Sequence, residues 1–407
     1  MRKWEETFPT EIIQEGKVRV RVPKLSAYVK TPSDYAPSMA PVFYNPVMKL
    51  NRDLAVLALQ CYQGNIPHEI SICEPLAGCG IRGLRFAKEV NRIKVVIVND
   101  INEKAFQLAE YNVHLNSCSE SILVNREDAN LLLAGYGRPG KRFDAIDIDP
   151  FGSPVPYLDS ALRSLHSGGF LAVTATDMAP LCGVHTNACL RRYGSRPLHT
   201  EYCHELAVRI LAGSLSMTAA RFDMGIKVIF SHSSAHYIRV YTLLDYGAKK
   251  ANKNVQKMGY VFHCFKCLRR EFKERLLPLE VPMECSNCGT KMHAAGPLWL
   301  GKLSDKQFCK SMIKQTEKMM FKNHREIRKI LTLIAAESDA PATYYVIDKV
   351  SKILKIPTPP TNLVLKALKS RGFQACLSHF NLSGIKSNAS SKDVAEVFLE
   401  ITRVRGR

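Results

Sequence analysis

The sequence lacks any apolar run that approaches the roughly 20 residues needed to span a bilayer. Its N-terminal residues also lack the apolar stretch of a secretory signal peptide. Low-complexity tracts and clear internal repeats are absent as well. These absences argue against membrane, secreted and repeat proteins, and we expect a soluble, cytoplasmic protein.

Acidic residues are scarce beside basic ones, because 37 Asp and Glu face 57 Lys and Arg, for a formal net charge of +20. Such an excess is typical of proteins that bind a polyanion, although a basic surface can also serve solubility alone. Basic residues are concentrated at 266–273, 310–329 and 403–407. The sum of these features favours nucleic acid as the partner.

The 13 cysteines do not form the even, closely spaced pattern of a disulfide framework. Cys264 and Cys267 form one Cys-x2-Cys pair, and Cys285 and Cys288 form a second pair after 17 intervening residues. Four thiolates on two tight turns can close a tetrahedral zinc site with no open position. We predict structural Zn²⁺ in the segment 261–293, with the flanking His263 and His293 as weaker alternative ligands. The site would order a short basic segment, including Lys266, Arg269 and Arg270, that could face RNA.

Strands and helices alternate between residues 70 and 177. Helical periodicity covers 81–90 and 103–115. This alternation predicts an α/β fold with a Rossmann-like, doubly wound and mostly parallel sheet. The apolar runs that we interpret as its strands are 70–76, 94–100, 121–125, 143–149 and 168–177.

The composition changes near residue 249, where Lys, Asn and Gly become frequent. We predict a Rossmann-like first domain, 1–248, with an N-terminal strand extension at 17–22, and a smaller α+β domain, 249–407, that includes the predicted zinc segment. Near the end of the chain, two helical segments precede a possible hairpin at 373–388. That order is compatible with a winged-helix-like module.

A glycine-rich turn follows the first predicted strand. Gly78, Gly80 and Gly83 form GxGxxG between a strand and a helix, which is the context of a nucleotide-binding turn. Asp100 ends the next strand and is suited to the hydroxyls of a ribose. Nicotinamide dinucleotides and S-adenosylmethionine both fit this arrangement.

The third and fourth strand ends separate these two cofactors. Asp128 follows the third strand and could accept a hydrogen bond from an adenine amine. Asp149 follows the fourth strand, and Pro150 and Phe151 come next. A carboxylate that accepts the N–H bonds of a nucleobase amine localises the nitrogen lone pair and can take its proton, and a ring stacks a base by about 1–3 kcal/mol. The pattern indicates an amino methyltransferase, whereas the simpler alternative is an acidic turn cap.

Three other functions stay open. A cysteine nucleophile that methylates a pyrimidine carbon would require Cys182, which we interpret as a buried structural residue. A zinc-bearing RNA-binding protein without activity would explain the charge and the cysteines alone. An amino methyltransferase could also act on another RNA or on DNA.

The motifs VFYNPVMKLNRD, GCGIRGLRFA, DIDPFGSP and ATDMAPLCGVH occur in this order. Together they resemble the tRNA (guanine-26-N2) dimethyltransferase family of class I S-adenosylmethionine-dependent methyltransferases. The resemblance runs from about Gly16 to the tail segment SHFNLSGIKSNA. It implies S-adenosylmethionine as the cofactor, tRNA as the partner, and one or two methyl transfers to N2 of guanine 26. No obligate protein partner is evident, and we expect a monomer.

The resemblance also implies residue roles. Asp149 resembles the catalytic carboxylate, and Phe43 and Phe151 resemble the aromatic residues that sandwich the guanine. The family's cofactor contacts, from the methionine end to the adenine, correspond to Arg52 and Arg82, then Asp100, then Asp128 and Ala129.

The glycine loop departs from the family pattern. Members often carry DxxSATGIRG, whereas this chain has EPLAGCGIRG with Glu74 and Cys79. The cofactor assignment stands, but the individual contacts of this loop are open.

Overall fold

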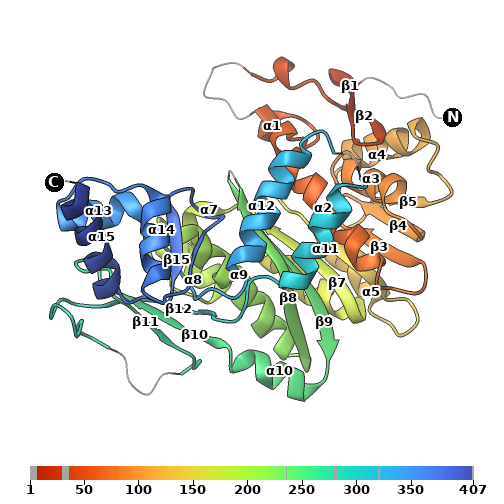
Figure 1. The fold of residues 1–407 in the computed structure, drawn as a ribbon. Coiled ribbons are helices and arrows are strands. Elements are labelled where there is room, and N and C mark those ends of the chain that lie inside the picture. Colours follow the sequence, from red (N-terminus) through yellow and green to blue (C-terminus); the bar gives the residue numbers. More distant parts are fainter. Residues whose placement is uncertain (1–6, 30–35, 235, 278–281, 320, 406–407) are drawn as a thin grey trace. The chain divides into compact units, whose positions relative to one another are not determined.

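The computed structural model describes residues 7–29, 36–234, 236–277, 282–319 and 321–405 (Figure 1). The first six residues and the last two residues of the basic tail lie outside the described residues. Within the described ranges, no helix combines the length and the apolar character that a membrane crossing requires.

The chain divides into two compact units. Unit 1 contains residues 1–150, 156–173 and 311–328, and unit 2 contains residues 151–155, 174–310 and 329–407. The domain boundary between residues 248 and 249 stays a prediction.

The largest sheet has seven strands in the order β5-β4-β3-β6-β7-β9-β8, and the five strands from β3 to β7 run parallel. This confirms the predicted Rossmann-like sheet. No local pattern predicted β8 and β9, an antiparallel pair, because their mostly buried residues give no alternation of apolar and polar side chains. The strands are β3 (Ile70–Glu74), β4 (Ile93–Asn99), β5 (Ile122–Asn125), β6 (Phe143–Ile148), β7 (Leu165–Ala175), β8 (Met224–Ser234) and β9 (Tyr237–Tyr246).

In unit 1, helices follow the parallel strands. The helix at 103–115 is confirmed, and the predicted helix at 81–90 ends one residue earlier. The side chain of Asn102 caps one helix, since it accepts a hydrogen bond from the backbone N–H of Lys104. The helices of this group are α3 (Ile81–Glu89), α4 (Glu103–Leu115), α5 (Ala129–Tyr136) and α6 (Leu158–Arg163), and α2 (Lys49–Gln63) precedes the first parallel strand.

At two positions of the GxGxxG turn, neighbouring atoms lie so close to the backbone that only glycine fits. A Cβ atom on Gly83 would lie 2.4 Å from Cγ2 of Val98, so glycine lets α3 pack against β4. Gly78 has φ +55°, and a Cβ there would lie 2.9 Å from the carbonyl oxygen of Phe43. The turn therefore brings the Phe43 backbone against the glycine loop.

An antiparallel hairpin at the N-terminus, β1 (Thr10–Glu15) and β2 (Val18–Pro23), confirms the strand predicted at 17–22. Asn112 of α4 holds it, because its side chain accepts from the Arg21 N–H at 2.7 Å and donates to the Arg21 carbonyl at 2.9 Å. The hairpin thus brings residues from the beginning of the chain to the glycine-loop helices.

In unit 2, a three-stranded sheet in the order β11-β10-β12 carries both cysteine pairs. Its strands are β10 (Met258–His263), β11 (Arg270–Lys273) and β12 (His293–Trp299), so each pair occupies a connection between neighbouring strands in sequence. Further helices of the described residues, before the last segment, are α1 (Ala36–Met39), α7 (Met178–Leu181), α8 (Thr186–Tyr193), α9 (Cys203–Ala220), α10 (Ala248–Val255), α11 (Lys306–Thr316) and α12 (His324–Glu337).

The last segment of unit 2 has its own sheet, β13-β15-β14, and its own core. Strand, two helices and hairpin follow one another as in a winged helix, which confirms that prediction. Leu268, which follows the first cysteine pair, belongs to this core, so the turn of that cysteine pair packs against the module. The elements are β13 (Tyr345–Val346), α13 (Ile347–Leu354), α14 (Thr361–Ser370), β14 (Ala375–Leu377), β15 (Gly384–Ser387) and α15 (Ser391–Arg405) (Figure 1).

Candidate active site and metal cluster

Asp100 lies where β4 ends, next to the glycine turn. One of its carboxylate oxygens accepts a hydrogen bond from the Gly78 N–H at 2.8 Å, and the other accepts from the Asn102 N–H at 2.9 Å. Burial raises the pKa of Asp100, and these two N–H groups oppose that rise. The backbone therefore fixes the orientation of a half-buried carboxylate beside the turn, as a ribose site requires.

Asp128 and Ala129 lie at the N-terminus of α5, after β5. The Asp128 carboxylate caps the helix, since it accepts from the N–H groups of Asn130 at 2.9 Å and Leu131 at 3.1 Å. Ala129 is buried. The capping bonds therefore position the predicted adenine-binding carboxylate on the end of a helix.

Arg82, from α3, is the centre of a cluster of acids. Its buried guanidinium lies 3.4 Å from Glu74 and 3.2 Å from Asp147, and it also pairs with Asp149. These acids come from the ends of β3 and β6, which are neighbours in the sheet. The structure thus places the predicted catalytic carboxylate and a predicted cofactor contact in one ion pair.

The charge of this cluster depends on Glu74. Burial raises the pKa of Glu74 to about 8, although Arg82 opposes the rise. The raised pKa favours the protonated form of Glu74, and the guanidinium of Arg82 also lies beside Asp147 and Asp149. Since Asp149 keeps 15% of its side chain exposed, the cluster opens to solvent at that residue.

Arg52, the other predicted contact to the methionine end of the cofactor, lies on α2. Its guanidinium makes a bidentate pair with Glu15, with both distances 2.7 Å, and donates to the Asn45 carbonyl at 3.1 Å. It also lies over the ring of Tyr44, 5.5 Å from its centre. No signal in the sequence indicated Glu15 as a partner of Arg52, because 37 residues separate the two.

The two predicted stacking residues are exposed aromatic side chains. Phe43 is 42% exposed and Phe151 is 71% exposed. The loop that carries Phe151 is held in unit 2, because Gly152 donates to the Thr176 hydroxyl at 2.6 Å and Thr176 donates to the Gly152 carbonyl at 3.0 Å. A held loop with an exposed ring can present a flat face to a base.

The four predicted zinc ligands meet in unit 2. The sulfur atoms of Cys264 and Cys288 are 3.5 Å apart, as are those of Cys267 and Cys285, and all four lie within 4.8 Å of one another. A tetrahedral zinc site with Zn–S bonds of about 2.3 Å requires sulfur separations of about 3.8 Å. The donor set and its spacing therefore fit a zinc ion.

The basic residues beside the cysteines differ in their surroundings. Arg270, one of the three that we expected to face RNA, is buried between the rings of Tyr202 and Tyr345, with centroid distances of 4.4 and 4.2 Å, and pairs with Glu201 at 2.7 Å. It is a packing residue, so that expectation was wrong for Arg270.

A second group of soft ligands consists of Cys182, Cys203 and His204, whose ligand atoms lie within 4.8 Å of one another. A hydrogen bond with Cys203, together with burial, raises the pKa of Cys182. Cys182 is therefore a buried thiol at neutral pH, which disfavours the alternative of a cysteine nucleophile.

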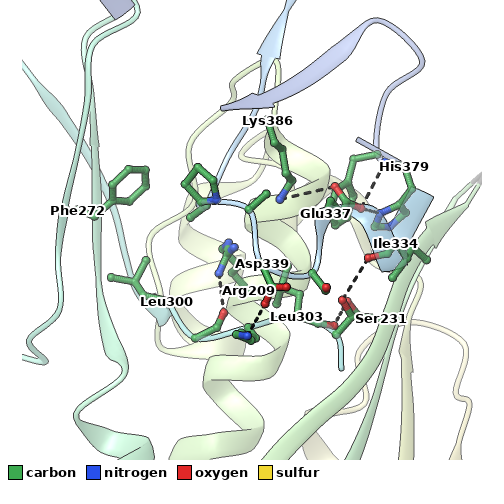
Figure 2. A pocket seen from close by; sticks show the side chains of 18 of the residues that line it. Arg209, Ser231, Phe272, Leu300, Leu303, Ile334, Glu337, Asp339, His379 and Lys386 are labelled. Carbon is green, nitrogen blue, oxygen red and sulfur yellow. Dashed lines mark hydrogen bonds and ion pairs between the residues drawn. The ribbon is translucent and has the colours of Figure 1, made fainter. Parts of the chain in front are cut away.

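Unit 2 contains another buried charge cluster, beside a cavity of about 290 Å³ (Figure 2). Lys386 lies 2.8 Å from Glu205 and 3.7 Å from Glu337, which pairs with His379. Glu205 also pairs with Arg209 at 2.8 Å. The sequence analysis named none of these residues, because they come from distant segments and carry no shared motif.

Comparison with known proteins agrees with the geometry. A family model described as N2,N2-dimethylguanosine tRNA methyltransferase matches residues 16–399. A tRNA (guanine(26)-N(2))-dimethyltransferase from Methanobrevibacter smithii is 39% identical over 392 residues, 96% of this chain and 98% of the relative. A tRNA (guanine(26)-N(2)/guanine(27)-N(2))-dimethyltransferase from Aquifex aeolicus is 36% identical over 397 residues, 96% of each chain. The solved structure of Trm1 from Pyrococcus horikoshii with S-adenosyl-L-methionine is 36% identical and covers 95% of this chain and 99% of that chain, with a TM-score of 0.84.

Proposed function

We propose, since this chain belongs to the N2,N2-dimethylguanosine tRNA methyltransferase family, that it methylates the exocyclic N2 amine of guanine 26 in tRNA. The enzyme is a methyltransferase that uses S-adenosylmethionine. The products are N2-methylguanosine and N2,N2-dimethylguanosine. The observation that supports this role most directly is Asp149 at the end of a central parallel strand, within an acidic cluster that opens to solvent.

S-Adenosylmethionine supplies an electrophilic methyl group on a sulfonium. The chain's own residues fit such a cofactor, because a glycine turn, an oriented carboxylate and a capped helix follow successive parallel strands. Asp100 would accept from the ribose hydroxyls. Asp128 and Ala129 would contact the adenine, and Arg52 and Arg82 would lie at the methionine end.

Asp149 would accept an N–H bond of the guanine amine and take its proton. This role requires an ionised, oriented carboxylate. Arg82 orients Asp149 through Oδ2. A carboxylate has two oxygens and about four lone-pair sites, so the pair with Arg82 does not use up its capacity to accept. Phe43 and Phe151 would hold the extruded base by stacking, since enzymes that act on a base take it out of its stack.

The decisive experiment is Asp149→Asn, which keeps the size of the side chain and removes its charge. We expect methyl transfer to tRNA to fall by about 10²–10⁴-fold, because the amine loses its proton acceptor. The affinity for S-adenosylmethionine, measured by calorimetry, should change by less than about 5-fold, a difference under roughly 1 kcal/mol. Asp159→Asn is the matched control, since Asp159 is an exposed acid on α6.

A normal rate in the Asp149→Asn enzyme would remove the assigned role. A thermal melt of the variant separates a chemical loss from unfolding, because the substitution also changes a partner of Arg82. Mapping of labelled methyl groups in total tRNA tests the position of the target guanine.

The four cysteines would hold Zn²⁺ as thiolates. All four positions around the ion would then be protein ligands, so zinc would supply structure and leave no site for a substrate. Its place next to Leu268 supports this view, because Leu268 belongs to the core of the winged-helix module. The partner of the enzyme would be tRNA alone, bound by a monomer with a charge of +20.

A further inference from the structure

Helices α13 and α14 form a helix-turn-helix. Val364 and Leu368, four residues apart, face the core of the module. Asn362, Lys366 and Lys369 are exposed at spacings of four and three residues, so they share one stripe on the opposite side of α14. In helix-turn-helix proteins the second helix contacts the nucleic acid, and α14 has that place in the chain.

The lysines of this stripe have no acidic partner. Neither Lys366 nor Lys369 has an ion pair with any of the described residues. The same is true of the exposed Lys352 and Lys355, which end α13 and begin the turn. Four ammonium groups without counter-charges within ion-pair distance therefore lie on the two helices and the turn between them.

Two other basic residues of the module are paired with acids of this chain. Arg371, directly after α14, lies 3.7 Å from Glu396 and 2.5 Å from Glu400. Lys386 of β15 is buried and pairs with Glu205. Because the fold satisfies these two cations and leaves the stripe unpaired, the positive charge of α14 is available to an external anion.

Double-helical RNA is the polyanion that fits a rigid, lysine-bearing helix in an enzyme of tRNA. The major groove of A-form RNA is too narrow for side chains to read its bases, so contacts fall on phosphates and on the shallow groove. Lysine suits such contacts, since its ammonium binds phosphate as a point charge.

We propose that the face of α14 formed by Lys366 and Lys369, with Lys352 and Lys355 beside the turn, binds the phosphate backbone of a double-helical arm of the tRNA. This proposal rests on the proposed function, since it names the part of the enzyme that holds the substrate. The contact is independent of base sequence, and specificity for one guanine comes from other residues.

The test measures binding of the full-length protein to an unmodified tRNA transcript over a range of salt concentrations. The variant Lys366→Glu/Lys369→Glu should raise the Kd at least about 10-fold at low salt and reduce the slope of log K against log salt by about 2, one unit for each lost phosphate contact. Lys366→Gln/Lys369→Gln should give the same loss of slope with a smaller change in Kd. Calorimetry with S-adenosylmethionine should give the wild-type affinity in both.

The matched control is Lys253→Glu/Lys392→Glu, which changes the net charge equally at exposed lysines of α10 and α15. Equal weakening by the control pair would overturn the proposal, because net charge alone would then explain the effect. An unchanged Kd and slope in the α14 variants would overturn it as well, while methylation by the wild-type enzyme would still support the proposed function. Conversely, tight tRNA binding without methylation by the wild type would remove only the proposed function.

Discussion

Glu74 in unit 1 and Glu205 in unit 2 are both buried carboxyls, yet their pKa values move in opposite directions. Burial raises the pKa of Glu74 to about 8, because its one guanidinium is shared with two other acids. Burial alone would raise the pKa of Glu205 too, but Lys386 and Arg209 lower it to about 2. The number of cations near each acid therefore decides its charge.

The same difference in the number of cations distinguishes the candidate catalytic cluster around Arg82 from the stabilising cluster around Lys386. The Arg82 cluster has more acid than base and opens at Asp149, so one carboxylate can accept from a substrate. The Lys386 cluster is buried, and it joins segments more than one hundred residues apart, since Glu205 also accepts from the Thr343 N–H, 138 residues away. Buried charge alone is weak evidence of a catalytic site. A partly exposed acid at a strand end is what distinguishes a candidate catalytic cluster from a structural one.

Removal of the proposed zinc ion is expected to have the largest effect on stability, and that effect should differ between unit 2 and unit 1. Full-length protein treated with a chelator, or carrying Cys264→Ser, should lose on the order of 5 kcal/mol or more of local stability in unit 2, since structural zinc contributes folding energy directly. Hydrogen exchange should accelerate in residues 258–299 and 345–403 much more than in β3, β4 and β6.

Cys376→Ser is the matched control for this prediction, because Cys376 lies in β14 of the same module and outside the four-cysteine cluster. Equal loss of protection in both units after chelation would contradict a local structural metal.

Lys386→Met should have the next largest effect. Removal of the cation leaves Glu205 and Glu337 buried near each other, at a cost of about 3–5 kcal/mol in the free energy of unfolding at pH 7. The lowered pKa of Glu205 contributes stability above about pH 4.5 that is lost as the pH falls towards 2. The cost of the substitution should therefore shrink in acid.

Urea unfolding at pH 7 and pH 3.5 measures this difference. Lys250→Met, which breaks an exposed pair with Asp245, should cost less than about 1 kcal/mol and serves as the control. A comparably small cost for Lys386→Met would contradict the comparison of the two clusters, since the buried Lys386 cluster would then not stabilise the fold.

Glu74→Gln tests the open cluster and should have the smallest effect. A carboxyl whose pKa rises to about 8 on folding makes the protein less stable as the pH increases from about 4.5 to 8. Between pH 5 and pH 8, the wild type should lose on the order of 3 kcal/mol more of its free energy of unfolding than the variant does. Urea titrations of the cofactor-free enzyme measure it, and the exposed Glu120→Gln is the control. Parallel pH profiles of Glu74→Gln and wild type would refute a protonated Glu74.

Residues of unit 1 near a strand end were predictable because their signals are local. A glycine turn, Asp100, Asp128 and Asp149 each follow an apolar run, and parallel strands bring their carboxyl ends to one edge. The four-cysteine cluster was predictable for the same reason, since two Cys-x2-Cys pairs are complete motifs. The sequence did not predict how deeply these residues are buried or which residues they contact.

What the sequence by itself determined is the alternation of strands and helices from β3 to β7, the positions of the acids at strand ends and the four thiols, all of which depend on neighbours a few residues away. Only the tertiary structure decided that Asp149 pairs with Arg82, 67 residues earlier, that Glu15 holds Arg52, and that Arg270 is buried between two rings. The physical reason is that burial and ion pairing depend on residues brought together from distant parts of the chain. Local composition carries no record of which charges meet.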